Sequence, residues 1–204
     1  MIETIYSRRS NLILGFHGCD RSVADKVIRG EAELLPSTND YDWLGNGIYF
    51  WENNESRAMD FAIEQHKRGR IEEPAVVGAI IDLGFCMDMT DSNYLDFLKE
   101  AYKICATRYE NVKQPLPANE TIGNGNDKIL RRLDCAVIQI AHELAKKYGQ
   151  RDFDSVKGVF WEGVELYPNA GFREKNHIQL CICNPNCIKG YFLPRVINAQ
   201  YANP

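Results

Sequence analysis

One ten-residue stretch, residues 43–52, constrains this chain more than any other. Two glycines one position apart, Gly45 and Gly47, let the backbone turn tightly and approach another group closely. The aromatic run that follows at once, residues 48–51, is typical of a short buried strand. About thirty residues earlier, an apolar segment ends in His17-Gly18. Together, the two pieces predict the walls of a pocket for a flat aromatic ligand.

Size and composition are those of one soluble globular domain. The chain has 204 residues, 45% hydrophobic and 25% charged, which is enough for a core of its own. The net charge of −4 argues against a protein that coats nucleic acid through a general basic face. No apolar run is long enough to span a membrane, and the N-terminus lacks the apolar core of a signal peptide. We therefore expect a single domain over residues 1–204, located in the cytoplasm, with no membrane partner.

The seven cysteines predict neither a disulfide framework nor a metal site. An odd count without a small disulfide-rich pattern fits a reducing compartment. Cys181, Cys183 and Cys187 lie close together, but their C-x-C-x3-C spacing is not that of a zinc site. We expect buried free thiols and no bound metal.

The hydrophobic pattern predicts an α+β fold in which strands and helices mostly alternate. Strands are expected at residues 11–16, 48–51, 75–83, 155–161, 178–183 and 188–192. Helices are expected at residues 23–29, 53–67, 91–102 and 128–148, of which the last has the most regular apolar face. Residues 110–126 contain prolines, glycines and asparagines and predict a long loop excursion.

Several familiar catalytic and cofactor motifs are absent. Residues 45–47 lack the third glycine of a dinucleotide fingerprint, and the chain has neither a phosphate loop nor a G-x-S-x-G elbow. His142 has no second histidine at zinc-protease spacing. The remaining candidates are His17, Tyr49 and residues 174–179. A histidine at a strand end, or a tyrosine in an apolar strand, is usually structural, and here the flanking glycines favour a functional role.

The sequence around these candidates resembles one enzyme group. Residues 45–50, Gly-Asn-Gly-Ile-Tyr-Phe, resemble the G-x-G-I-Y-F segment of the poly(ADP-ribose) polymerase and diphtheria-toxin group of ADP-ribosyltransferases. Residues 14–18 resemble the first motif of that group, a strand that ends in His-Gly. The whole chain also resembles small, toxin-like bacterial proteins of this fold. The resemblance implies one catalytic domain with a split mixed β-sheet flanked by helices.

The resemblance implies that NAD is the co-substrate. His17 would bond the ribose beside the nicotinamide, and the backbone of Gly18 would pair with the carboxamide. Tyr49 would stack on the cationic nicotinamide ring, which suits an electron-rich aromatic face. Three further residues would line the same site: Gly47, Ser56 and Phe61. The last two stand near the places of the group's carboxamide-binding serine and second stacking aromatic residue.

The third motif of the group, a glutamate at the start of a late strand, is missing at its expected place. Three residues are candidates for its role: Gln179 first, Glu174 second and His177 third. Gln179 lies on the same strand face as His177, two residues later. A neutral glutamine could bond the ribose but could not act as a general base. Loss of the glutamate implies transfer of a single ADP-ribose, and not of a polymer.

The resemblance thus implies a mono-ADP-ribosyltransferase that cleaves the nicotinamide–ribose bond. The ADP-ribose would be transferred to a macromolecular acceptor, either a protein or a nucleic acid. One biological role of such an enzyme would be that of a toxin. Two alternatives stay open: a glycohydrolase that gives the ribose to water, and an inactive module that binds NAD or ADP-ribose. A protein that modified targets in its own host would be expected to have a neutralising partner. Residues 110–126 and 167–175 are either acceptor-recognition loops or plain surface loops.

Overall fold

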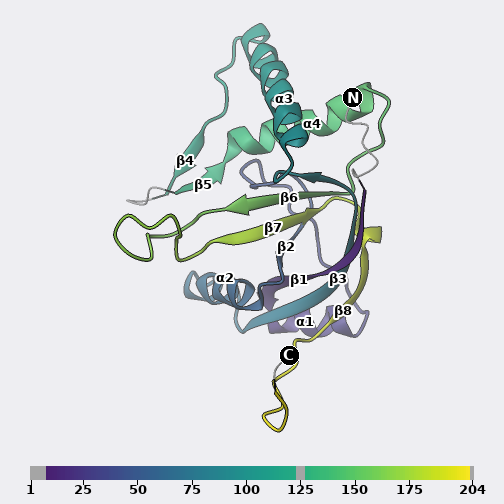
Figure 1. Ribbon diagram of the computed structural model, residues 1–204, viewed down its shortest axis with the longest axis vertical. Helices are drawn as coiled ribbons and strands as arrows, with labels where there is room; N and C mark the ends of the chain where they lie inside the picture. Colours follow the sequence, from purple (N-terminus) through teal and green to yellow (C-terminus); the bar gives the residue numbers. More distant parts are fainter. Residues whose placement is uncertain (1–7, 123–126, 203–204) are drawn as a thin grey trace.

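The computed structural model describes residues 8–122 and 127–202 as a mixed β-sheet with helices on its faces (Figure 1). The strands are β1 (Arg8–Asp20), β2 (Ile48–Glu52), β3 (Pro74–Asp88), β4 (Asn119–Thr121), β5 (Lys128–Arg131), β6 (Ser155–Phe160), β7 (His177–Ile182) and β8 (Ile188–Phe192). The helices are α1 (Arg21–Ile28), α2 (Glu55–Lys67), α3 (Ser92–Asn111), α4 (Arg132–Lys147) and a 3-10 turn, η1 (Pro185–Cys187). This arrangement confirms the predicted α+β class.

Parts of two predictions lie outside the described residues. The expectation that no signal peptide is present concerns residues 1–7 in part, and the predicted loop excursion includes residues 123–126. Among the helices of the described ranges, none is both long and apolar enough to cross a membrane.

The main sheet closes on itself because β1 pairs with two strands. The strand order is β1-β2-β7-β6-β3-β8, and β1 also pairs with β3. β1 meets β2 over only two residue pairs, Gly15 with Glu52 and Phe16 with Trp51. At its far end, β3 meets β6 in parallel over three pairs. The sheet therefore consists of two halves, β1-β3-β8 and β2-β7-β6, which are joined at two short seams.

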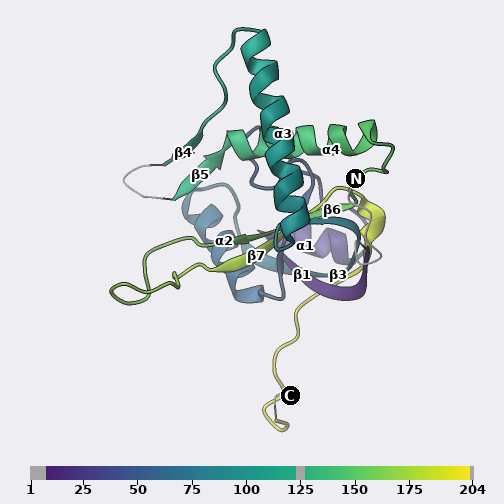
Figure 2. The same cartoon turned by 45° about the horizontal axis from the view of Figure 1, so that its top comes forward.

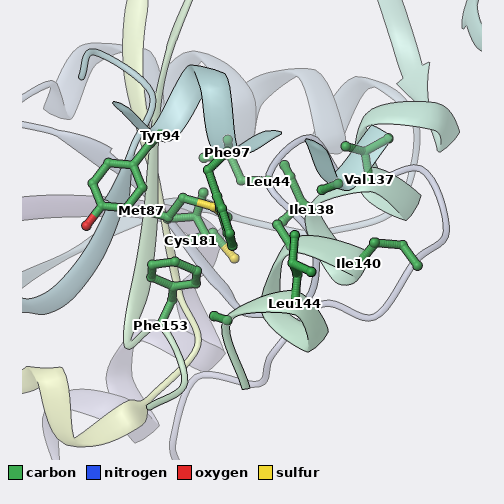
Figure 3. Packing of buried hydrophobic residues seen from close by; sticks show 14 of the residues in the cluster. Leu44, Met87, Tyr94, Phe97, Val137, Ile138, Ile140, Leu144, Phe153 and Cys181 are labelled. Carbon is green, nitrogen blue, oxygen red and sulfur yellow. The ribbon is translucent and has the colours of Figure 1, made fainter. Parts of the chain in front are cut away.

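Three hydrophobic cores hold these layers together. Helices α3 and α4 cover one face of the half-sheet β2-β7-β6 (Figures 1 and 2), and their core includes Met87, Phe97, Leu144, Phe153 and Cys181 (Figure 3). A second core lies between the two half-sheets and α1, with Val27, Phe50, Val77, Ile81 and Leu180 among its members. A smaller core joins α2 to the seam and consists of Phe16, Trp51, Ala58 and Val76. Successive side chains of β2 point to opposite faces of the sheet and thus belong to different cores.

The predicted start of the last long helix was wrong. Residues 128–131 form strand β5, which pairs with β4 inside the predicted loop excursion. The helix begins only at Arg132. There the side-chain oxygen of Asn119 accepts hydrogen bonds from the backbone N–H groups of Leu133 and Asp134, at 3.0 and 3.2 Å. A residue distant in sequence therefore caps the helix, so no local capping signal marks its start.

The connection between β6 and β7 projects from the body as a long hairpin (Figure 1). We call residues 161–176 the β6–β7 arm. Backbone hydrogen bonds join its sides, for example from Lys175 N–H to the Glu162 carbonyl at 2.9 Å. Its exposed apolar side chains are Trp161, Val164, Leu166, Tyr167 and Phe172. The arm begins after Phe160 and ends before His177, which pair directly in the sheet.

Candidate functional site

The two sequence motifs meet at the seam between β1 and β2. His17 Nδ1 lies 2.8 Å from the backbone carbonyl oxygen of Tyr49, and the His17 ring lies edge-on to Phe50, with 5.8 Å between centroids. Because a carbonyl oxygen only accepts, Nδ1 carries the proton. Burial lowers the pKa of His17 and keeps the ring neutral. Nε2 is left with a lone pair, which can accept a hydrogen bond from a hydroxyl group.

The Tyr49 side chain builds the tight turn before β2. Its hydroxyl donates to the Gly45 carbonyl at 2.6 Å and accepts from Leu44 N–H at 2.9 Å. Gly45 has a φ of 78°, in the left-handed region that favours glycine. The ring packs against the core under α3 and α4, and burial raises the pKa of Tyr49. The hydroxyl therefore serves the turn, and a stacking role for Tyr49 rests on its ring alone.

Close packing inside the protein explains the other glycines of the two motifs. A Cβ atom on Gly18 would overlap the backbone carbonyl oxygen of Ala58 in α2. A Cβ atom on Gly47 would lie 2.6 Å from Cys181 Sγ in β7. These glycines allow strands to approach their neighbours, and a close approach of a ligand to their backbone remains a prediction.

A group of polar side chains, three of them buried and one half-buried, lies between α2 and the first half of β7. We call Trp51, Arg57, His177 and Gln179 the buried polar cluster. Trp51 pairs directly with Gln179 in the sheet, and His177 lies two residues earlier, so these three side chains share one face. Arg57, in the first turn of α2, places its guanidinium carbon 5.6 Å from the centroid of the Trp51 ring.

Every member of the buried polar cluster has a buried polar atom without a hydrogen-bond partner in the described part of the chain. These atoms are Trp51 Nε1, Arg57 Nε and Nη1, His177 Nε2 and Gln179 Oε1. Trp51, Arg57 and His177 are only 4%, 7% and 6% exposed. A buried polar group left unpaired costs about 1–3 kcal/mol, so native proteins rarely contain them in groups. A group that met all of these atoms would need both a carbonyl oxygen to accept and N–H or O–H groups to donate.

His177 presents an acceptor to this cluster. Its Nδ1 lies 2.7 Å from the Lys175 carbonyl oxygen, so Nδ1 carries the proton and Nε2 has the lone pair. Burial lowers the pKa of His177, and the positive charge of Arg57 lowers it further. Aromatic rings surround the imidazole, with Trp43 at 6.1 Å and Phe160 at 5.6 Å between centroids. The ring is therefore a neutral acceptor in an aromatic box.

Two arginines place positive charge beside His177. Arg57 Nη2 forms an ion pair with Glu162 Oε2 at the base of the β6–β7 arm, at 3.0 Å, and both side chains are nearly buried. The guanidinium of Arg131 lies over the rings of Trp43 and Phe160, 4.2 and 4.8 Å from their centroids. Guanidinium groups favour carbonyl and phosphate oxygens. Both guanidinium groups are paired with carboxylates, Arg57 with Glu162 and Arg131 with Asp134 at 3.4 Å.

The three candidates for the missing glutamate lie in different places. Gln179 and His177 both belong to the buried polar cluster. Glu174 is exposed on the β6–β7 arm, where its backbone N–H bonds the carbonyl of Val164 at 3.0 Å. The structure therefore brings the first and third candidates together and leaves the second at the surface.

The start of α2 also differs from the expected register. Ser56 is exposed, and its hydroxyl bonds the side chain of Asn54, which caps the helix. The buried residue at this point is Arg57. Phe61 lies one turn later on the same side, with its ring 5.1 Å from that of Trp51. The spacing of four residues between Arg57 and Phe61 is the signal that could have identified Arg57.

Trp51 was also missed by the sequence analysis, although a signal existed. It follows Tyr49 by two residues in the same strand and so shares its face. Its indole N–H is one of the unpaired donors of the cluster. In the described ranges, no group of three or more histidine, cysteine, aspartate or glutamate residues is placed to hold a metal ion.

Comparison with known proteins adds one relative. No family model matches the chain, and no solved structure matches it. A protein of Methanocaldococcus jannaschii, described as uncharacterized, is 28% identical over 194 residues, which cover 85% of this chain and 83% of that protein. Its description names no activity, so a function has to be argued from the site.

Proposed function

We propose that the protein is an NAD-dependent mono-ADP-ribosyltransferase. It would cleave the nicotinamide–ribose bond and transfer one ADP-ribose to a macromolecular acceptor. The observation that carries the proposal is the hydrogen bond between His17 and the Tyr49 carbonyl. This bond joins the two family-like motifs into one wall. The start of β7, where the resemblance expects the third motif, lies next to the same strand.

The protonation of His17 supports a role in ribose binding. Its Nε2 is a neutral acceptor because Nδ1 donates to the Tyr49 carbonyl. A ribose hydroxyl can donate to such an atom. The rings of Trp51 and Phe61 would add aromatic surface to that of Tyr49 for the flat nicotinamide ring. The unpaired N–H groups of Arg57 would suit a carbonyl oxygen.

His177 and Gln179 would share the place of the missing glutamate. Each has a buried acceptor atom without a partner in the described ranges, and either can accept from a ribose hydroxyl. Neither carries the negative charge that would stabilise an oxocarbenium-like transition state. This observation favours a second candidate function, a module that binds NAD or ADP-ribose without turnover.

The β6–β7 arm is the proposed contact for the acceptor. It leaves the sheet between Phe160 and His177, directly beside the buried polar cluster. Trp161, Tyr167 and Phe172 are each more than half exposed. Exposed apolar side chains in one place favour contact with a protein. We therefore propose a protein acceptor, and a neutralising protein partner would meet the same surface.

The test combines a turnover assay with a binding assay. Purified protein is incubated with a cell lysate and NAD labelled in its adenosine part, and released nicotinamide and labelled macromolecules are measured. The variants His17→Ala and His177→Ala are compared with His66→Ala, which changes an exposed histidine at the end of α2. We expect release and labelling by the wild type and His66→Ala, and losses of about a hundredfold in the other two.

Each outcome separates the candidate functions. Nicotinamide release without a labelled macromolecule would identify a glycohydrolase. A rise in melting temperature with NAD, without release, would identify a binding module. If NAD causes neither release nor a rise in melting temperature, the proposed function is wrong.

A further inference from the structure

The cysteines differ from one another in one respect that the sequence did not indicate. All seven are free thiols, and six of them are buried, whereas Cys183 is half-buried. It follows the last residue of β7, at the opposite end of that strand from His177. Six residues of extended chain correspond to about 20 Å. Cys183 is therefore separate from the buried polar cluster.

The Cys183 sulfur faces an imidazole. His142 on α4 places its Nε2 4.0 Å from Cys183 Sγ. Phe153 lies edge-on to the His142 ring, with 5.5 Å between centroids, and so limits its orientation. The Cys181 carbonyl oxygen lies 4.0 Å from the same sulfur. The thiol is thus positioned between a partner helix and its own strand.

The carboxylate of Asp154, whose charge acts on Cys183, is engaged elsewhere. Asp154, just before β6, bonds the backbone N–H of Phe85 and the side chain of Asn184, at 2.7 and 2.9 Å. It also forms an ion pair with Arg151 at 2.7 Å. The carboxylate oxygens of Asp154 are thus bonded to these groups and not to the Cys183 thiol.

We propose that Cys183 and His142 form a reactive thiolate–imidazole pair, which soft electrophiles modify before any other cysteine of the chain. The neighbouring groups favour the thiolate. The Cys181 thiol and then His142 lower the pKa of Cys183 to about 6, although burial and the charge of Asp154 oppose this effect. A thiolate beside histidine is the reactive form of cysteine.

Five of the other six cysteines have the opposite tendency, and the sixth, Cys86, is buried. Burial raises the pKa to about 11 for Cys19, Cys135 and Cys187. Burial also raises the pKa of Cys105 and Cys181. At neutral pH these thiols stay protonated and enclosed, so they react slowly. The contrast gives Cys183 a selective reactivity.

The proposed step is a simple substitution. With iodoacetamide as the probe, the thiolate of Cys183 donates an electron pair to the methylene carbon. A sulfur–carbon bond forms, the carbon–iodine bond breaks, and iodide leaves. The proton of the original thiol goes to His142 Nε2 and from there to water. The step needs no oxidant or reductant.

The pH dependence of this reaction is the test. The full chain is treated briefly with iodoacetamide at pH 6.5 and pH 8.5, and the modified cysteines are identified by peptide mass spectrometry. An ordinary thiol with a pKa of about 8.5 reacts roughly 50-fold faster at the higher pH. We expect the rate at Cys183 to rise by less than about twofold, because the thiolate is already formed at pH 6.5. This ratio does not depend on how accessible the sulfur is.

Two variants separate the pair from a merely exposed thiol. His142→Gln is expected to make the rise with pH several times steeper, whereas the matched control His66→Gln leaves it unchanged. Cys183→Ser is expected to remove the fast-reacting thiol. The proposal is wrong if the rate at Cys183 rises as steeply as that of glutathione, or if His142→Gln leaves the rise unchanged. Neither result depends on NAD binding.

Discussion

Two residues of strand β2, only two positions apart, differ in whether their polar groups are hydrogen-bonded. At Tyr49, the hydroxyl donates to Gly45 and accepts from Leu44, so the turn is internally bonded. At Trp51, the buried indole N–H has no partner in the described ranges. The unpaired atoms of Arg57 and Gln179 lie with it. Both places share one strand face, but only the second offers free donors and acceptors.

This difference separates two roles that the sequence presents as one. The turn at Tyr49 is complete without a ligand, so it contributes stability and shape. The buried polar cluster is incomplete, and unpaired buried groups of this kind lower stability unless a ligand or water meets them. We therefore expect mutations at the turn to change the free energy of unfolding, and mutations in the cluster to change ligand binding.

The largest effect is expected from Tyr49→Phe. Removing the hydroxyl leaves the Leu44 N–H without its partner and takes the shorter of two hydrogen bonds from the Gly45 carbonyl, which keeps the Cys181 thiol at 3.6 Å. This change should lower the free energy of unfolding by about 1–3 kcal/mol. Urea unfolding measures this change. Tyr148→Phe, at an exposed position, is the matched control and should lower it little. A loss below about 0.5 kcal/mol for Tyr49→Phe would mean that the turn is not held by the hydroxyl.

A smaller effect is expected from pH. The pKa values of His17 and His177 are lowered in the folded protein, below an unfolded value of about 6.5. Below this pH the unfolded chain binds more protons than the native one, so stability is complete above pH 6.5 and falls as the pH decreases. Each histidine contributes at most about 1 kcal/mol of loss between pH 6.5 and 5.5.

Urea unfolding at pH 7.5, 6.5 and 5.5 measures this loss. His177→Phe should remove the contribution of His177, so the free energy of unfolding should decrease less as the pH falls. His66→Phe should leave this decrease unchanged. An unchanged decrease in both variants would show that His177 does not contribute to the loss of stability at low pH.

The smallest effect on stability is expected from Gln179→Leu. This change replaces a buried amide oxygen that lacks a partner with an apolar group of similar size, so the free energy of unfolding should stay within about 0.5 kcal/mol or rise. The rise in melting temperature caused by NAD should disappear. Gln65→Leu is the control, since the Gln65 oxygen accepts from Arg70 at 3.2 Å and lies outside the cluster. A normal response to NAD in Gln179→Leu would remove this residue from the proposed site.

Local patterns predicted much of the fold. The strand at residues 188–192 and the helix that follows residue 54 lie where the period and the capping residues placed them. The start of α4 was missed because its cap, Asn119, comes from a distant strand. The pairing of β1 with both β2 and β3 could not be predicted either, because strand partners depend on contacts between distant residues.

By itself, the sequence determined that His17-Gly18 and the turn before Tyr49 belong to strands that could form one wall, because glycine spacing and strand periodicity are local properties. Only the tertiary structure decided that the Tyr49 hydroxyl is used inside the turn and that Glu174 lies at the surface. It also decided that Arg57, Trp51, His177 and Gln179 meet. Which polar atoms remain unpaired depends on burial by three separate segments, and no local pattern records that.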